Sequence, residues 1–231
     1  MDIPILELKM ALRAFVFAME DDLEIRYVSI FLAIENRAER IELLNHIRLQ
    51  IRKRMGARFS KLTGKFYAHR GLPRLYLEVM WALSMEHLED GDYNNVFRAA
   101  REVLLRDSND TDAIREKIVE AALIAGKLRI ARKTLDDYEH LSCFFPLAQK
   151  YWGNVLEHYL SKRFDRAIMA LAEARRECGR IEKYLIGKRY LPKKLKGNYA
   201  HSSEKEAQHL AVSPLAVWSL YPDAIAWLRD Q

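Results

Sequence analysis

The apolar positions between residues 73 and 178 follow a helical spacing that recurs at a fixed interval. Three short turns are each followed by a large hydrophobic residue, Tyr93, Leu128 and Phe164, and these are 35 and 36 residues apart. Small or apolar residues follow three, seven and ten places later in each copy: Val96, Ala100 and Val103; Ala131, Leu135 and Tyr138; Ala167, Leu171 and Ala174. A constant period of this length, with one helix-turn-helix per unit, is typical of helical repeat arrays. The spacing therefore predicts an all-α fold with about three helix pairs.

The pattern within each copy also predicts where the helices lie. Six helices are expected, near residues 73–88, 94–106, 112–125, 128–139, 147–161 and 164–178. The run from Ser108 to Thr111, and Pro146, supply residues that favour helix starts. Helices joined by turns this short must pack as antiparallel pairs. No segment alternates apolar and polar residues over several positions between turn signals, so no strand is predicted.

Helical spacing continues on both sides of this repeat block. Residues 5–19 and about 22–55 carry apolar stripes, and Gly71-Leu72-Pro73 breaks the chain before the first repeat. Ser203 and Glu206 form a capping box that predicts a helix start. Trp218 and Trp227 are expected to cover the open end of the repeat core. We therefore divide the chain into three segments: an N-terminal helical extension with a basic segment (1–72), the repeats (73–180) and a capping tail (181–231).

The repeat block resembles tetratricopeptide (TPR) repeats. The second helix of each pair carries the resemblance, because a turn and a large hydrophobe precede a slot for a small residue. Ala131 and Ala167 match this slot, and Val96 takes it in the first repeat. The aromatic slot of the first helices holds Met80, Arg115 and Tyr151, of which only the last matches. The tail resembles the closing segment of many bacterial TPR proteins.

This resemblance implies a binding groove, because in TPR arrays the first helix of each pair lines the concave face. Carried over position by position, the groove residues are Trp81, Met85, Glu116, Glu120, Trp152, Leu156 and Tyr159. Two exposed Trp side chains beside two carboxylates would suit a protein or peptide partner with apolar anchors and a basic centre. A register error of one residue would instead place both Trp side chains in the core.

The net charge of +6 is distributed unevenly and suggests a second kind of partner. No acid occurs between Glu42 and Glu78, and the basic segment 48–74 includes Arg52, Lys53, Arg54, Arg58, Lys61 and Lys65. The aromatics Phe59, Phe66 and Tyr67 are interleaved with these cations, and a second basic segment spans 175–196. Cations that contact phosphates, with aromatics that stack on bases, are the means of non-specific nucleic-acid binding. The alternative is a solvated helix face with a loop that packs against the acidic repeats.

The residue patterns of catalysis and metal binding do not occur in this sequence. The seven His residues form no HExxH motif and no pair at metal-ligand spacing, so neither a metal nor a cofactor is expected. No apolar run approaches the ~20 residues of a membrane helix. Cys143 and Cys178 have no CxxC spacing and are expected to be free thiols in a reducing cytoplasm. The sequence thus predicts a non-enzymatic cytoplasmic adaptor or regulatory scaffold, with a nucleic-acid-associated regulator as the alternative.

Overall fold

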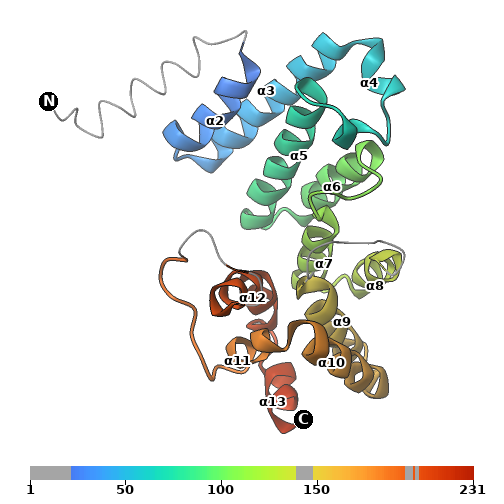
Figure 1. The fold of residues 1–231 in the computed structure, drawn as a ribbon, viewed down its shortest axis with the longest axis vertical. Helices are drawn as coiled ribbons and strands as arrows, with labels where there is room; N and C mark the ends of the chain where they lie inside the picture. The colour runs from blue at the N-terminus through green and yellow to red at the C-terminus, as the bar shows by residue number, and fades with distance from the viewer. Residues whose placement is uncertain (1–21, 139–147, 196–199, 201–202) are drawn as a thin grey trace, which may run out of the picture. The chain divides into compact units, whose positions relative to one another are not determined.

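A computed structural model describes residues 22–138, 148–195, 200 and 203–231 of the chain (Figure 1). Throughout this part of the chain the secondary structure is helical, and the single β-bridge, between Lys65 and Asp107, belongs to no strand. The all-α prediction is confirmed. The chain forms two compact units that divide between Ile114 and Arg115. These units differ from the predicted segments, since the first repeat belongs with the N-terminal extension and the later repeats belong with the tail.

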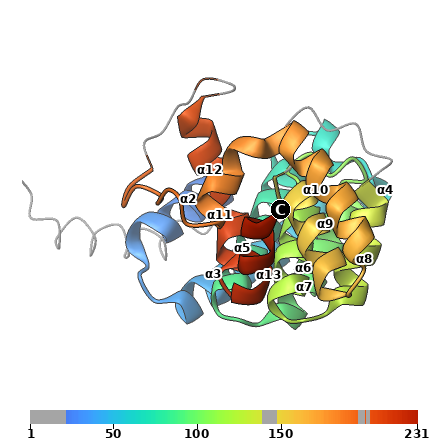
Figure 2. The ribbon, with the colours of Figure 1, turned by 90° about the horizontal axis from the view of Figure 1, so that it is seen from below.

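The first unit is built from a row of helices in which each packs on the next. Its elements are α2 (Leu23–Ala33), α3 (Arg37–Met55), α4 (Ala57–Lys61), the 3-10 turn η1 (Phe66–Ala68), α5 (Leu72–Glu89) and α6 (Tyr93–Arg106). Helix α3 contacts α2 and α5, and α5 also contacts α6 (Figures 1 and 2). The stretch 22–55, expected to form one or two helices, forms two, because Asn36 caps a new start by accepting a hydrogen bond from the Glu39 N–H at 3.0 Å.

The second unit contains the remaining helices. These are α7 (Ile114–Ile124), α8 (Leu128–Asp137), α9 (Ala148–Leu160), α10 (Phe164–Cys178), the 3-10 turn η3 (Gly179–Ile181), α11 (Glu182–Leu185), α12 (Glu204–Trp218) and α13 (Pro222–Asp230). Helix α9 contacts α8, α10, α12 and α13 (Figures 1 and 2). All six helices predicted for the repeat block are present, and their ends lie within two residues of the predicted ones.

The three repeat turns have the same backbone hydrogen bonds. Each contains one residue in the left-handed region: Gly91 (φ 74°), Gly126 (φ 65°) and Lys162 (φ 58°). The next residue donates its N–H to the carbonyl five places earlier: Asp92 to His87 (2.9 Å), Lys127 to Ala122 (2.8 Å) and Arg163 to His158 (2.9 Å). This is the Schellman motif, which ends a helix and satisfies its last carbonyls. The turns therefore recur in structure at the interval that the hydrophobic pattern gives.

The core positions predicted after each turn are all buried. The nine residues that follow Tyr93, Leu128 and Phe164 at three, seven and ten places are 0–3% exposed. Phe164 itself is 47% exposed, because its ring lies at the turn against Tyr159. Small residues in these slots allow the paired helices to approach closely, which explains why Ala recurs there. The predicted helix at 5–19, Cys143 and Pro146 lie outside the described residues.

The capping tail is part of the second unit. Ser203 Oγ accepts a hydrogen bond from the Glu206 N–H at 3.1 Å, so α12 begins where the capping box predicts. Trp218 is fully buried and meets the Trp152 ring edge-on at 6.1 Å between centroids. Trp227 on α13 is only half-buried and lies against the Tyr159 ring. The two Trp residues therefore cover the repeat helices to different degrees.

Candidate partner-binding site

One face of α5 carries a continuous row of half-buried side chains. Arg74, Glu78, Trp81 and Met85 are spaced by four, three and four residues, which places them on the same side of a helix. The opposite face of α5 is buried against α3 and α6. Pro73, in the first turn, and Gly71, at φ 68°, start the helix immediately before this row. The two groove residues predicted for the first repeat, Trp81 and Met85, thus lie on a partly exposed face.

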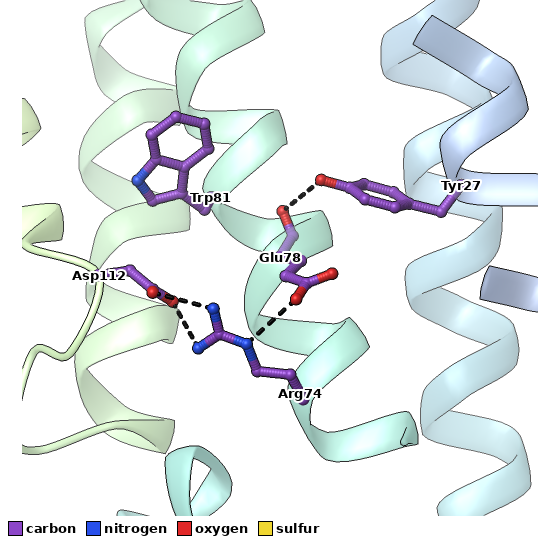
Figure 3. Close-up of a pocket in the computed structure, with 5 residues that line it drawn as sticks. All are labelled: Tyr27, Arg74, Glu78, Trp81 and Asp112. Carbon is purple, nitrogen blue, oxygen red and sulfur yellow. Dashed lines mark hydrogen bonds and ion pairs between the residues drawn. The ribbon is translucent and has the colours of Figure 1, made fainter. Parts of the chain in front are cut away.

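A pocket of about 280 Å³ lies over this face (Figure 3). It is lined by Arg74, Glu78 and Trp81 of α5, by Tyr27 of α2, and by Asp112 of the loop that precedes α7. This volume lies just below the ~300–1,000 Å³ that is typical of small-molecule sites. The pocket therefore suits one large side chain of a partner better than a cofactor.

Arg74 joins the two carboxylates of the pocket (Figure 3). Its Nη1 and Nη2 donate to the two Asp112 oxygens at 3.0 Å each, and its Nε donates to Glu78 Oε1 at 3.1 Å. Burial acts to lower the pKa of Arg74, but the hydrogen bonds and charges of Asp112 and Glu78 outweigh it, so the pKa is raised. Because these donors are turned to protein carboxylates, Arg74 positions the acids and is not available to a bound anion.

Tyr27 closes the pocket from α2 and stays neutral. Its hydroxyl donates to the backbone carbonyl of Glu78 at 3.5 Å, which is a long hydrogen bond (Figure 3). Burial, assisted by the Glu78 charge and opposed by Arg74, raises the pKa of Tyr27 to about 12. The phenol is therefore protonated at neutral pH, and its ring is an aromatic wall of the pocket.

A second cavity of about 260 Å³ adjoins the first and shares Tyr27, Arg74 and Glu78 with it. Its further lining includes Glu24 and Val28 of α2. Together the two cavities have three carboxylates (Glu24, Glu78 and Asp112) against one guanidinium, which is a net charge of −2. Two aromatic walls with an excess of negative charge favour a cation.

Exposed apolar side chains continue from this site along α2. Val28 lines the second cavity and is 55% exposed, and three further apolar residues of the same helix are also exposed: Ile25 (41%), Phe31 (45%) and Leu32 (59%). Ile25, Val28 and Leu32 are three and four residues apart and so lie along one side of α2. A run of this kind on a short helix is a candidate contact surface for a partner.

Three of the predicted groove residues lie in the core of the second unit. Trp152 and Leu156 are 0% exposed and Glu120 is 7% exposed. Helix α12 packs on α9, and Trp218 Nε1 donates to the carbonyl oxygen of Trp152 at 3.2 Å. The prediction that these residues line an open groove is therefore corrected, because the chain's own tail covers them. For Trp152, the alternative of a core position holds.

The carboxylates predicted to attract a basic peptide are engaged within the second unit. Glu116 Oε1 accepts the backbone N–H of Gln149 at 3.2 Å, in the first turn of α9. Glu120 Oε2 accepts from Lys117 Nζ at 2.8 Å and from Ser213 Oγ of α12 at 2.6 Å. Tyr159 is half-buried between the rings of Phe164 and Trp227. These residues stabilise helix starts and the docking of the tail.

The predicted basic surface is exposed, but two of its three aromatics are not. Arg52, Lys53, Arg54, Arg58, Lys61 and Lys65 are all exposed. Phe59 (5%) and Phe66 (0%) are buried and meet the Tyr76 ring edge-on. Only Tyr67, at 39%, is exposed. Of the two alternatives for this segment, stacking of Phe59 and Phe66 on bases is contradicted, because both side chains pack between the segment and α5.

Four cations of the second basic segment pair with nearby acids. Arg175 pairs with Glu182 at 2.7 Å and Arg176 pairs with Glu177 at 2.7 Å. Lys183 and Arg189 both pair with Glu204 at the start of α12. The Arg175–Glu182 pair links α10 to α11, and the Lys183–Glu204 pair links α11 to α12.

Of the residues that line the pocket between Tyr27 and Trp81, sequence reasoning named Trp81 as a groove residue but did not name Tyr27, Arg74, Glu78 or Asp112. The spacing of Arg74 and Glu78 from Trp81 was a signal in the sequence, because all three recur at helical intervals. Tyr27 and Asp112 had no such signal. They reach the pocket only through the contacts of α2 and of the loop before α7 with α5, and these depend on the tertiary fold.

Within the described ranges, no group of three or more His, Cys, Asp or Glu side chains could hold a metal ion. None of the helices described combines the length and apolar character needed to cross a membrane. Comparison of the chain with family models, with curated proteins and with solved structures finds no match.

Proposed function

We propose that this protein is a non-enzymatic interaction module, an adaptor or regulatory scaffold, that binds a protein or peptide segment through the α5 face of its first unit. The segment would place a Lys or Arg side chain in the pocket between Tyr27 and Trp81. The observation that carries this proposal is a pocket with two aromatic walls and a net charge of −2 over its two cavities. The kinship to TPR proteins is part of the same proposal.

The chemistry of the pocket selects for a cation in two ways. A guanidinium or ammonium group over an aromatic face contributes about 0.5–2 kcal/mol, with the larger values where water is excluded. The carboxylates add a favourable charge, since Arg74 neutralises only one of the three. An acidic side chain would meet repulsion from the remaining carboxylates, and the donors of Arg74 are already directed at Asp112 and Glu78.

Flanking residues of the partner would contact the exposed apolar side chains of α2. Val28 lines the pocket's neighbouring cavity, so an apolar residue beside the bound Lys or Arg could pack on it. The proposed partner is therefore a segment with a basic residue next to aliphatic residues. The corresponding surface of the second unit is covered by α12, which leaves the first unit as the binding surface. The proposed setting is the cytoplasm, which rests on the cysteine usage of the sequence.

A peptide-display selection against the immobilised full-length protein would test this function. We expect the enriched sequences to contain Lys or Arg flanked by aliphatic residues. Trp81→Ala should weaken their binding about 3–30-fold, which corresponds to the cation–π range. Met169→Ala is the matched control, because Met169 is an exposed apolar residue (74%) of α10 in the second unit. An acidic consensus, or binding that Trp81→Ala leaves unchanged, would contradict the proposal.

A further inference from the structure

We propose that the end of α3, α4 and the loop after it form a second binding surface, for the phosphate backbone of double-stranded nucleic acid. Its centre consists of Lys53, Arg58, Lys61 and Lys65, with Arg52 and Arg54 beside them, and all six are exposed. We call this set the basic platform. Arg58 and Lys61 are one turn apart on α4 and therefore face the same side. The inference is independent of the peptide pocket.

Four cations of the basic platform, Lys53, Arg58, Lys61 and Lys65, are not compensated by an acid among the described residues of the first unit. No acidic residue occurs from 43 to 77. Four carboxylates of α5, α6 and the loop before α7 pair with other arginines: Glu86 with Arg40, Glu78 and Asp112 with Arg74, and Glu102 with Arg106. Asp107 of this loop accepts the backbone N–H groups of Asn109 and Thr111. Among the described residues, Lys53, Arg58, Lys61 and Lys65 form no ion pair with a carboxylate. These four cations are therefore free to contact an external anion.

The fold holds these cations on a fixed surface. Phe59 and Phe66 anchor the segment by edge-on contacts with Tyr76 of α5, at 4.9 and 5.7 Å between ring centroids. Arg106 of α6 lies over the Phe59 ring at 4.2 Å and donates to Thr63 Oγ1 at 2.6 Å. The Gly64 N–H donates to the Leu105 carbonyl at 2.9 Å. Because the backbone that carries these cations is already ordered, phosphate binding does not have to order it, which lowers the entropic cost.

The large apolar side chains between Arg52 and Lys65 are buried or partly buried, and Tyr67 is the one exposed aromatic of the described segment 48–74, which favours a duplex backbone over other polyanions. Single-strand binding depends on aromatics that stack on unpaired bases. Membrane attachment of a basic surface uses apolar side chains that enter the lipid. In the described segment 52–65, Met55 and Phe59 are buried and Leu62 is partly buried. Contacts to the phosphates of a duplex need only the cations, and they are independent of base sequence.

The test is the salt dependence of binding to a fluorescent 24-base-pair duplex of mixed sequence, measured by anisotropy with the full-length protein. If all six cations contact phosphates, the slope of log affinity against log salt is about −5, a loss of about 10³-fold between 50 and 200 mM salt. For the triple variant Arg58→Ser, Lys61→Ser, Lys65→Ser, the affinity for the duplex should fall only about 40-fold between 50 and 200 mM salt. At 50 mM salt this variant should bind the duplex at least tenfold more weakly than the wild type. Arg52 is left in place because it also lies over the Phe59 ring at 5.0 Å.

The matched control removes the same charge from exposed positions of the second unit, with Lys188→Ser, Lys193→Ser and Lys194→Ser. This control should change the affinity less than the first triple variant does, and both variants should keep the wild-type melting temperature. If both triple variants lose the same affinity for the duplex, the effect depends on net charge alone, and the proposed site is overturned. No duplex binding by the wild type at 50 mM salt would also overturn it. Binding to phosphatidylserine vesicles without binding to the duplex would assign the surface to membranes instead.

Discussion

Trp218 donates its indole N–H to the carbonyl oxygen of Trp152 at 3.2 Å, and its ring meets the Trp152 ring edge-on at 6.1 Å. Both side chains are 0% exposed, although they are 66 residues apart and lie on helices α12 and α9. The contact joins the tail to the repeat helices. It makes the C-terminal tail a structural part of the second unit rather than an appendage.

We therefore expect Trp218→Ala to destabilise the protein by about 3–5 kcal/mol, since it leaves a large cavity between α12 and α9. Urea unfolding followed by circular dichroism would measure the change. Tyr190→Ala is the control, because Tyr190 is an aromatic residue of the same tail that is 87% exposed. If the two variants unfold at the same urea concentration, the tail does not dock as described.

The third repeat turn offers a stabilising substitution. Lys162 occupies the left-handed position that Gly91 and Gly126 hold in the other two turns, at φ 58°. A side chain at this φ costs about 1 kcal/mol or more, and glycine removes that cost. Lys162→Gly should therefore raise the free energy of unfolding by about 1 kcal/mol.

Gly126→Ala is the reciprocal control for this turn. No atom lies within 4 Å of the added Cβ, so only the backbone conformation at φ 65° is changed. The free energy of unfolding of this variant should be about 1 kcal/mol lower than that of the wild type. A Lys162→Gly variant that is less stable than wild type would show that the three turns are not equivalent.

Gly153 should not tolerate alanine, although it lies within helix α9. In an exposed helix, Gly→Ala stabilises by about 1 kcal/mol. Here the new Cβ would lie 2.9 Å from Val119 Cγ1, and the β-branched Val119 has little rotamer freedom with which to move away. We expect a net loss of about 1–3 kcal/mol, seen as a lower melting temperature.

Gly179→Ala serves as the comparison. Gly179 has a helical conformation, with φ −59° and ψ −27°, and open space around the Cβ position. This substitution should leave the melting temperature unchanged or slightly higher. A Gly153→Ala variant that behaves in the same way would contradict the close approach of α7 and α9.

His158 should make stability depend on pH. Burial, and then the charge of Arg132, lower the pKa of His158 to about 4, although Glu157 acts in the opposite direction. The unfolded chain takes up a proton near pH 6.5 that the folded protein does not bind until about pH 4. The contribution of His158 to the free energy of unfolding is therefore complete above pH 6.5. It is lost as the pH falls toward 4, by up to about 1.4 kcal/mol per pH unit.

The measurement is the difference in unfolding free energy between pH 7 and pH 5. His158→Gln should show a smaller difference than the wild type, because the substituted side chain does not titrate. His46→Gln, at an exposed position of α3, should keep the wild-type difference. An unchanged pH dependence in His158→Gln would show that His158 is not held neutral in the fold.

The helices and the repeat turns could be predicted because their signals are local. The positions three, seven and ten places after Tyr93, Leu128 and Phe164 are buried as the spacing predicts, and Ser203 starts α12 as a capping residue should. The division of the chain followed sequence similarity between copies. It therefore separated helix pairs from the flanking helices that pack against them.

The orientation of Trp152 could not be predicted, since the same apolar face of α9 fits an open groove or a groove that another helix fills. That choice is made by α12, more than 50 residues later in the chain. The sequence left two alternatives open for Phe59 and Phe66 for a related reason. Aromatics between basic residues look like a stacking surface until the fold shows that Tyr76 and Arg106 cover them.

The pocket between Tyr27 and Trp81 is the central claim, and the indole N–H resonances of the four Trp residues report on it directly. In the ¹⁵N-labelled full-length protein, the Trp81 resonance would be assigned from the variant Trp81→Phe. The indoles of Trp152 and Trp218 donate to buried carbonyls and serve as internal references.

Titration with the blocked peptide Leu-Arg-Leu, and with Leu-Glu-Leu as the charge control, is the most direct measurement. We expect the arginine peptide to shift the Trp81 resonance to saturation, the glutamate peptide to leave it unchanged, and the Trp152 and Trp218 resonances to stay in place with both. A Trp81 resonance that does not move with the arginine peptide, or that moves equally with the glutamate peptide, would contradict the account.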